Sequence, residues 1–371
     1  MKIDDSVLRN EEKAVLALRR LYRKYGYEPY RMSKFEEYDL YARNKDFLVS
    51  DNVITFTDTD GRLLALKPDV TLSIIKNSGD VCGYVKKVYY DENVYRVSKN
   101  SRSFREIMQT GLECIGSIDD LCICEVVALA AESLSCISED YILDISHMGI
   151  VSAATDLLGV TEETKRRIIK CVSEKNACEI RTICRSENTD DAAAARICGL
   201  AELSGTAAEV LPRLSELMHG TAAENDVRCL SGLFENLSSC GLSDRLRIDF
   251  SVIHDTNYYN GIVFRGFING IPTGILSGGQ YDILMKKMNK KAGAIGFAVY
   301  LDMLDRTETD CGFDVDTVLL CGESTDAKEI FAAAQRLRAE GADVSVQHAL
   351  PEKLRCRRVL KYQNGRLDEI G

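Results

Sequence analysis

The chain has 371 residues, of which 45% are hydrophobic and 28% charged, with a formal net charge of −10 at pH 7. This composition is typical of a globular protein with one large domain or two to three smaller ones. No segment approaches the ~20 apolar residues of a membrane span, and residues 1–5 are too polar for a secretory signal. The acidic balance also argues against a general nucleic-acid binder, because phosphate contacts need clustered Lys and Arg. We therefore expect a cytoplasmic protein without membrane contact.

The 14 cysteines are scattered along the chain and form no recognisable metal motif. Cys122 and Cys124 have Cys-x-Cys spacing, and the 4 histidines lie too far apart in sequence to complete a zinc site. We expect reduced, mostly buried thiols, no metal and no cofactor.

The first part of the chain alternates between helical and strand patterns. A helical stripe at residues 7–25 ends at Gly26, and Gly61 suits a turn between two short strands. A helix is expected to begin near Asp69, after Pro68. The expected strands are 27–32, 53–57, 63–66, 85–97 and 106–115, the last two forming a long antiparallel pair.

The later part contains a long helical region, at 161–239, placed between strand patterns. Asn269-Gly270 predicts a hairpin turn between strands 256–267 and 271–276. Further expected elements are helix 123–134, strands 141–145 and 246–253, and a C-terminal βαβ unit made of strand 317–321, helix 326–340 and strand 344–347, followed by strand 359–362. The pattern predicts an α+β fold: an antiparallel sheet flanked by helices, with a helical insertion and a short C-terminal unit.

Several polar side chains could together form a small-molecule pocket. Gln109 and Glu113 lie four apart on one expected strand and therefore share a face. Carboxylates, an amide and phenols would suit a ligand with an ammonium group and a ring bearing hydrogen-bond donors. The candidates are Asp69, Thr71, Gln109, Glu113, Tyr258 and Tyr259, with Arg96, Arg105 and His254 as further pocket candidates.

Each of these residues alone also has a structural interpretation. Asp69 could simply cap a helix, and Glu113 could be a solvated strand residue. The tyrosines could serve packing, Arg96 and Arg105 could form surface ion pairs, and a lone histidine is usually structural. Spacing by itself does not separate these interpretations.

Residues 1–306 resemble the histidyl-tRNA synthetase-like class II catalytic core. The segment 66–71 (Leu-Lys-Pro-Asp-Val-Thr) is similar to the family's amino-acid contact, and 93–113 is similar to class II motif 2. Residues 257–260 (Asn-Tyr-Tyr-Asn) and 277–282 (Ser-Gly-Gly-Gln-Tyr-Asp) resemble the histidine-specific element. The resemblance implies that Asp69, Thr71, Gln109, Glu113, Tyr258 and Tyr259 contact histidine.

The sequence departs from the active synthetases where ATP would bind. Met303 stands where the family has an arginine, His254 aligns with the catalytic arginine, and Ser98 replaces an acidic residue of motif 2. A charged hydrogen bond contributes about 1.5–3 kcal/mol, so losing two arginines should make amino-acid activation very poor. The resemblance therefore implies binding without catalysis.

This pattern resembles the regulatory subunits of ATP phosphoribosyltransferase. The resemblance implies a subunit without catalytic activity that assembles with the short catalytic subunit, activates it and mediates feedback inhibition by histidine in the first step of histidine biosynthesis. It also implies a homodimeric core, no tRNA partner, and a C-terminal unit (307–371) that is a truncated form of the anticodon-binding domain. The alternatives are an active histidyl-tRNA synthetase and a paralogue that binds another amino acid.

Overall fold

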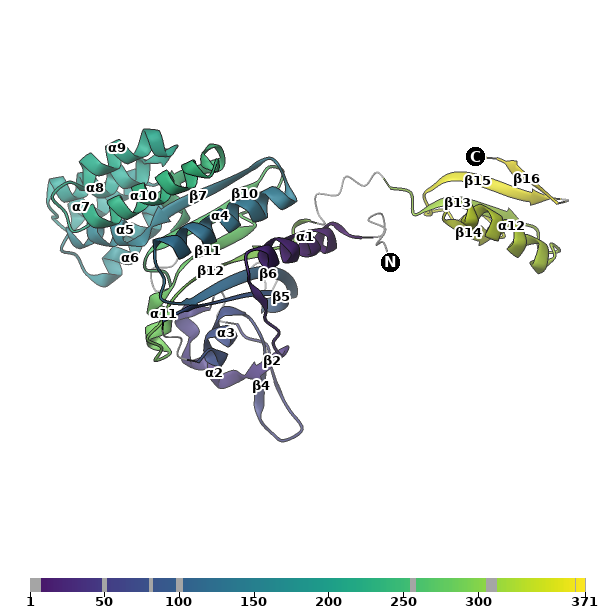
Figure 1. Ribbon diagram of the computed structural model, residues 1–371, viewed down its shortest axis with the longest axis horizontal. Coiled ribbons are helices and arrows are strands. Elements are labelled where there is room, and N and C mark those ends of the chain that lie inside the picture. Colours follow the sequence, from purple (N-terminus) through teal and green to yellow (C-terminus); the bar gives the residue numbers. More distant parts are fainter. Residues whose placement is uncertain are drawn as a thin grey trace. The chain divides into compact units, whose positions relative to one another are not determined.

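The computed structural model (Figure 1) describes residues 8–48, 52–79, 83–97, 103–253, 258–304, 312–363 and 365–370. The chain forms two compact units, Met1–Thr307 and Glu308–Gly371. None of the helices in the described ranges has the length and apolarity that a bilayer crossing requires.

The described part of the first unit is built on a nine-stranded sheet, in the order β1-β5-β6-β12-β11-β10-β7-β9-β8. The middle of the sheet, in the order β5-β6-β12-β11-β10-β7, is antiparallel throughout, as predicted. The outer pairs β1–β5 and β7–β9 are parallel. The strands are β1 (Glu28–Pro29), β5 (Val85–Val97), β6 (Phe104–Gly116), β7 (Tyr141–His147), β8 (Ser204–Gly205), β9 (Leu246–Asp249), β10 (Ile262–Ile268), β11 (Leu276–Gln280) and β12 (Gly293–Tyr300).

The two faces of this sheet bury different sets of side chains. Helices α1 (Asn10–Lys24) and α4 (Asp120–Ile137) pack on one face, where Leu112 and Cys114 of β6 join their apolar core. Glu113 and Ile115 point to the opposite face, because successive side chains of a strand alternate. The central strand β6 therefore serves a core on one side and a different environment on the other.

A smaller subdomain covers part of the second face. It consists of the three-stranded sheet β2-β4-β3 and short helices. Side chains from α2, α3 and α11 form a second apolar cluster there with β5 and β6. The elements are β2 (Phe35–Glu37), β3 (Thr55–Thr57), β4 (Leu63–Leu66), α2 (Tyr38–Arg43), α3 (Thr71–Asn77), α11 (Asp282–Lys287) and the 3-10 turn Lys45–Phe47.

The sequence predicted this subdomain only in part. The strands β3 and β4 were expected, and Gly61 between them has the positive φ of +81° that the turn requires. Helix α3 begins at Thr71, close to the expected start at Asp69. The elements β2 and α2 were missed, because their alternation is short and lies in a polar stretch.

The expected helical region is confirmed by helices that follow β7. Thr161, Asn176 and Asp190 cap three of these helices by accepting a bond from a backbone N–H. The helices are α5 (Met148–Asp156), α6 (Glu162–Ser173), α7 (Ala177–Ser186), α8 (Asp191–Glu202), α9 (Ala207–Met218) and α10 (Glu224–Ser239). A short strand, β8, interrupts this region and pairs with β9 at the sheet edge.

The hairpin predicted around Asn269-Gly270 has a longer connection than expected. The turn forms, and Gly270 has φ +86°, but the second strand is Leu276–Gln280 instead of residues 271–276. Ile271 and Ile275 are buried in the first core cluster instead of extending the ladder. The predicted strand 246–253 is likewise shorter, because a 3-10 turn, Phe250–Val252, follows β9.

The C-terminal unit contains the predicted βαβ arrangement. Strands β13 (Val315–Cys321) and β14 (Val344–Gln347) are parallel and joined by α12 (Ala327–Ala339), which ends near Gly341 at φ +94°. Strands β15 (Cys356–Gln363) and β16 (Arg366–Glu369) complete a four-stranded sheet. Leu319, Leu337 and Leu360 belong to a core cluster of this unit.

The position of β6 predicts a large effect of shortening its core side chain. Leu112 is fully buried, so Leu112→Ala should lower the free energy of unfolding by about 2–5 kcal/mol, measured by urea denaturation. Leu121→Ala is the matched control, because Leu121 on α4 is 77% exposed and its truncation should change little. Equal effects of the two substitutions would contradict the assignment of this core.

Candidate functional site

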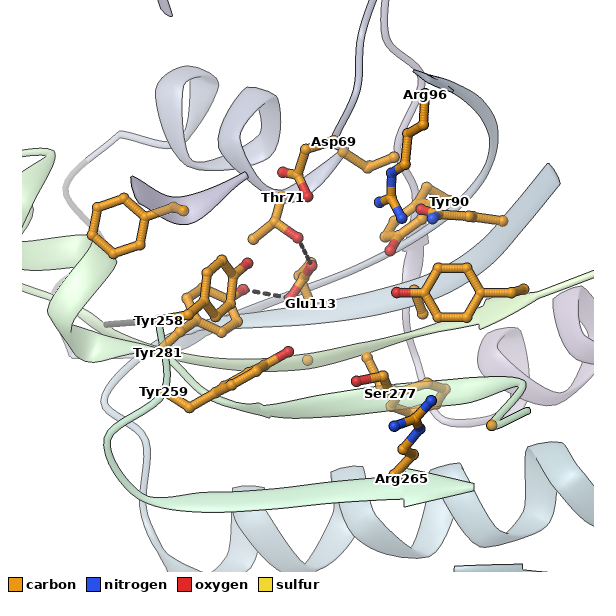
Figure 2. A pocket seen from close by; sticks show the side chains of 18 residues that line it. Asp69, Thr71, Tyr90, Arg96, Glu113, Tyr258, Tyr259, Arg265, Ser277 and Tyr281 are labelled. Atoms are coloured by element: carbon orange, nitrogen blue, oxygen red, sulfur yellow. Dashed lines mark hydrogen bonds between the residues drawn. The ribbon is translucent and has the colours of Figure 1, made fainter. Parts of the chain in front are cut away.

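A cavity of about 330 Å³ lies on the sheet face opposite α1 and α4 (Figure 2). Side chains from β5, β6, β10, β11 and β12 line it, together with the segment that leads into α3. The structure brings together all of the residues for which a histidine contact was expected: Asp69, Thr71, Gln109, Glu113, Tyr258 and Tyr259.

Glu113 lies at the centre of this cavity and is only 2% exposed. Thr71 Oγ1 donates a hydrogen bond to Glu113 Oε1 at 2.8 Å, and the Tyr281 hydroxyl donates to Oε2. Burial raises the pKa of Glu113 to about 8, assisted by the charge of Asp69, although both hydrogen bonds act in the opposite direction. The carboxyl group therefore holds its proton through most of the neutral range.

A glycine makes room for this carboxyl group. Gly296 on β12 lies directly opposite Glu113 in the ladder. A Cβ atom at position 296 would lie 1.8 Å from Glu113 Oε2, closer than any contact that atoms tolerate. The absence of a side chain at Gly296 is thus a condition for burying Glu113 here.

The segment that carries Asp69 is anchored to β5 by cations. Lys67, which is fully buried, forms an ion pair with Glu92, and Arg96 Nε donates to the Pro68 carbonyl at 3.0 Å. These contacts place Asp69 at the cavity wall.

Asp69 itself combines a helix-capping role with a place in the cavity. It is half-buried, and its Oδ1 accepts a hydrogen bond from Leu72 N at 2.8 Å. Burial raises its pKa, while that hydrogen bond and the charge of Arg96 lower it. Asp69 therefore both accepts a hydrogen bond from a backbone amide in the first turn of α3 and lines the cavity.

Aromatic rings form one wall of the cavity. The rings of Tyr258 and Tyr259 lie 4.6 Å apart, and Tyr258 also contacts Tyr281 and Phe47 at 5.7 Å and 6.0 Å between centroids. Burial raises the pKa of Tyr258 and Tyr259 above the ordinary value, so their hydroxyl groups stay neutral. This wall can pack against a planar ring and offer hydroxyl groups to it.

Gln109 adds an unused hydrogen-bonding group. Its side chain is 3% exposed, and Nε2 has no hydrogen-bond partner among the described residues. A buried amide without a partner costs about 1–3 kcal/mol, and a ligand with an acceptor group would remove that cost. Gln109 thus marks where a polar ligand atom fits.

Of the further pocket candidates that the structure describes, one lines the cavity and one does not. Arg96 lines the cavity, 5.9 Å from the ring of Tyr300, whereas Arg105 is exposed and absent from the lining. Met303 is partly buried and packs against the first core cluster. The candidate His254 lies outside the described residues, as does Ser98, the position where the sequence departs from motif 2.

Sequence reasoning missed several cavity residues. Tyr281 lies in the segment 277–282 that was compared with the family, and its position could have been inferred there. Arg265 had no such signal, because it reaches the cavity only through the pairing of β10 with β11. Tyr90 and Tyr300 likewise depend on sheet register. Among the described residues, no group of His, Cys, Asp and Glu side chains is arranged to hold a metal ion.

The fold is that of the class II aminoacyl-tRNA synthetases. Residues 3–304 match the sequence profile of the histidyl-tRNA synthetase family. Since this match covers most of the chain, the protein belongs to that family.

Many of the similar proteins are named as regulatory subunits of ATP phosphoribosyltransferase. The ATP phosphoribosyltransferase regulatory subunit of Clostridium kluyveri is 28% identical over 91% of this chain and 88% of its own. A crystal structure described as an ATP phosphoribosyltransferase regulatory subunit/histidyl-tRNA synthetase from Bacillus halodurans has a TM-score of 0.73 and 26% identity, over 91% of this chain and 88% of that one. A chain of the ATP phosphoribosyltransferase complex from Thermotoga maritima shares the fold, with a TM-score of 0.61, 18% identity and coverage of 81% and 98%.

The raised pKa of Glu113 predicts a specific pH dependence of stability. The folded protein keeps a proton up to about pH 8 that the unfolded chain releases near its ordinary pKa of 4.5. The contribution of this proton to the free energy of unfolding is therefore complete below about pH 4.5 and is lost as the pH rises to about 8. Relative to Glu113→Gln, the free energy of unfolding of the unmodified protein should fall as pH rises from about 5 to about 8. Urea denaturation across this range measures the difference, and parallel profiles would contradict the prediction.

Proposed function

We propose that this protein is the regulatory subunit of an ATP phosphoribosyltransferase and that its cavity binds histidine as the feedback signal. The relatives that carry this name, together with the arrangement of the cavity, support the proposal. The observation that carries it is the buried Glu113, held by Thr71 and Tyr281 beside an aromatic wall.

The distribution of charge in the cavity suits an amino acid with a polar ring. Asp69 provides a carboxyl group for an ammonium group, and a carboxyl oxygen of Glu113 can accept a hydrogen bond from a ring N–H. Arg96 and Arg265, which also line the cavity, provide cations for a carboxylate. Tyr258 offers a ring face against which an imidazole can pack.

We also propose that the protein lacks catalytic activity of its own. Met303 occupies the position where the family's active members have an arginine, and its side chain packs against the apolar core. An uncharged thioether cannot neutralise phosphate charge, so adenylate formation loses one of its electrostatic supports. The cavity would then retain binding alone.

The proposed mechanism is allosteric and requires the short catalytic subunit as a partner. Histidine can inhibit that partner only if it binds one state of the complex more tightly than the other. We propose that a homodimeric core senses histidine and that the C-terminal unit is a shortened counterpart of the anticodon-binding domain, with no tRNA bound.

Substitution of Glu113 tests the histidine site. Glu113→Ala removes the acceptor at the cavity centre and should weaken histidine binding about tenfold or more in isothermal titration calorimetry. The matched control is Glu106→Ala, since Glu106 is an exposed carboxylate on the same strand and not in the cavity lining. If the alanine variant does not fold, Gln109→Ala provides an independent test. Unchanged affinity in folded Glu113→Ala would disprove the site.

The regulatory role is tested with the partner present. Co-expressed with a short ATP phosphoribosyltransferase catalytic subunit, the protein should co-purify with it and raise its activity, and histidine should lower that activity. A complex containing Glu113→Ala should be active but resistant to histidine. Histidine-dependent exchange of pyrophosphate with ATP by the protein alone would instead establish a working synthetase and overturn the proposal.

A further inference from the structure

The aromatic wall of the cavity is assembled from two separate segments of the chain. Tyr258 and Tyr259 lie before β10, whereas Tyr281 directly follows β11, and none of the three lies in a helix or a strand. The rings are nevertheless in contact, with centroids 4.6 Å apart for Tyr258 and Tyr259 and 5.7 Å apart for Tyr258 and Tyr281 (Figure 2). Because the strands do not include these residues, contacts outside the strands must hold the rings together.

A reciprocal pair of hydrogen bonds joins the two segments beside the tyrosines. The backbone N–H of Asp282 donates to Asn260 Oδ1 at 2.7 Å, and Asn260 Nδ2 donates to Asp282 Oδ2 at 3.1 Å. Asn260 directly follows Tyr259, and Asp282 directly follows Tyr281. The Asn260–Asp282 clamp therefore fastens the segment before β10 to the segment after β11.

Asp282 connects this clamp to a third element, the start of β12. Its Oδ1 accepts a hydrogen bond from the Ala294 N–H at 2.9 Å, and Gln280 Nε2 donates to Oδ2 at 3.2 Å. Together with Asn260, three donors thus face the Asp282 carboxyl group, and both of its oxygens are engaged. A carboxylate suits this place because it has several lone pairs and no N–H group.

Glycines next to the clamp allow the close approach of its side chains. A Cβ atom at Gly261 would lie 2.0 Å from Gln280 Oε1, and a Cβ atom at Gly293 would lie 2.9 Å from Asp282 Oδ1. Gly261 follows Asn260, and Gly293 precedes Ala294. The backbone therefore lies closer to these polar groups than a residue with a side chain would permit without a shift.

The clamp residues themselves do not line the cavity. Tyr258, Tyr259 and Tyr281 belong to the described lining, but Asn260 and Asp282 do not. Any effect of the clamp on a ligand must therefore act through the tyrosines. One of them, Tyr281, also donates a hydrogen bond to Glu113, so its placement affects the centre of the cavity.

We propose that Asn260 and Asp282 are positioning residues of the histidine site, which hold the three tyrosine rings where the imidazole ring packs. The identity of the ligand rests on the proposed function, whereas the placement of the rings does not. Side chains that become ordered only on binding weaken the affinity, because their loss of conformational freedom opposes association. The clamp orders the rings before the ligand arrives.

Asp282→Asn tests the clamp with little change of volume. Whichever way the new amide is oriented, its NH2 group faces an N–H donor of the network. Histidine should bind about tenfold more weakly in isothermal titration calorimetry. Asp60→Asn is the matched control, because it makes the same change at an exposed position outside the lining and should leave the affinity unchanged. Unchanged affinity in folded Asp282→Asn would overturn the proposal, and Asn260→Ala is the second variant if Asp282→Asn does not fold.

Exchange of the two residues tests the pairing itself. Asn260→Asp alone places two carboxyl groups opposite each other and should also weaken histidine binding about tenfold. In Asn260→Asp/Asp282→Asn, the amide at position 282 can donate to the carboxylate at position 260, which still accepts from the backbone N–H of residue 282. The Gln280 amide can turn over to present its oxygen. The double variant should therefore bind within about threefold of the unmodified protein, and losses that simply add would contradict the pairing.

Two measurements without ligand separate the clamp from the identity of the ligand. The chain has no tryptophan, so its near-ultraviolet circular dichroism is dominated by tyrosine. This spectrum should change in Asp282→Asn and return in the double variant, and the amide of residue 282 should exchange hydrogen faster in Asn260→Ala. An unchanged spectrum and exchange rate would overturn the clamp.

Urea denaturation distinguishes positioning from stabilisation alone. A residue that only stabilised the fold would lower the free energy of unfolding in Asp282→Asn and leave the histidine affinity of the folded protein unchanged, which would overturn the proposal. If the unmodified protein bound no histidine, the proposed function would fail, while the spectrum and the exchange rate would still decide whether the clamp holds the rings.

Discussion

The burial of the Glu113 carboxyl group imposes conditions on the whole first unit. A buried carboxyl group needs hydrogen-bond partners and space, which Thr71, Tyr281 and Gly296 supply. Thr71 begins α3, whereas Tyr281 directly follows β11 and Gly296 lies in the middle of β12, about 200 positions later in the chain. The smaller subdomain must therefore dock on this sheet face, and β12 must pair with β6 in this register. The residues that accommodate this buried acid also line the cavity.

Membership in the histidyl-tRNA synthetase family explains the fold. The side chains that line the cavity determine what the fold can bind. The acidic and aromatic groups of the cavity are present and connected. Met303, which the family resemblance aligns with an arginine of the active synthetases, packs against the apolar core. The proposed loss of catalysis with retention of binding fits the regulatory name that the relatives carry.

Strand β6 has a different environment on each of its sides. Alternation places the carboxyl group of Glu113 in the cavity and the side chain of Cys114 in the apolar core, although the two residues are adjacent. Close-packed layers transmit small displacements because they leave little free volume for absorbing them. The packing of the core side of β6 therefore helps to fix the position of Glu113.

The sequence by itself determined the elements with strong periodicity, such as α1, the β5–β6 pair and β14, because local side-chain patterns specify them. Through the family resemblance it also indicated Asp69, Gln109 and Glu113 as cavity residues. Tertiary structure alone decided the late start of β11, where Ile271 and Ile275 turn into the core, and the short elements β2 and α2. It also brought Arg265 into the cavity and left Arg105 outside. Strand register and the docking of the subdomain depend on contacts between residues far apart in sequence, and no local pattern encodes them.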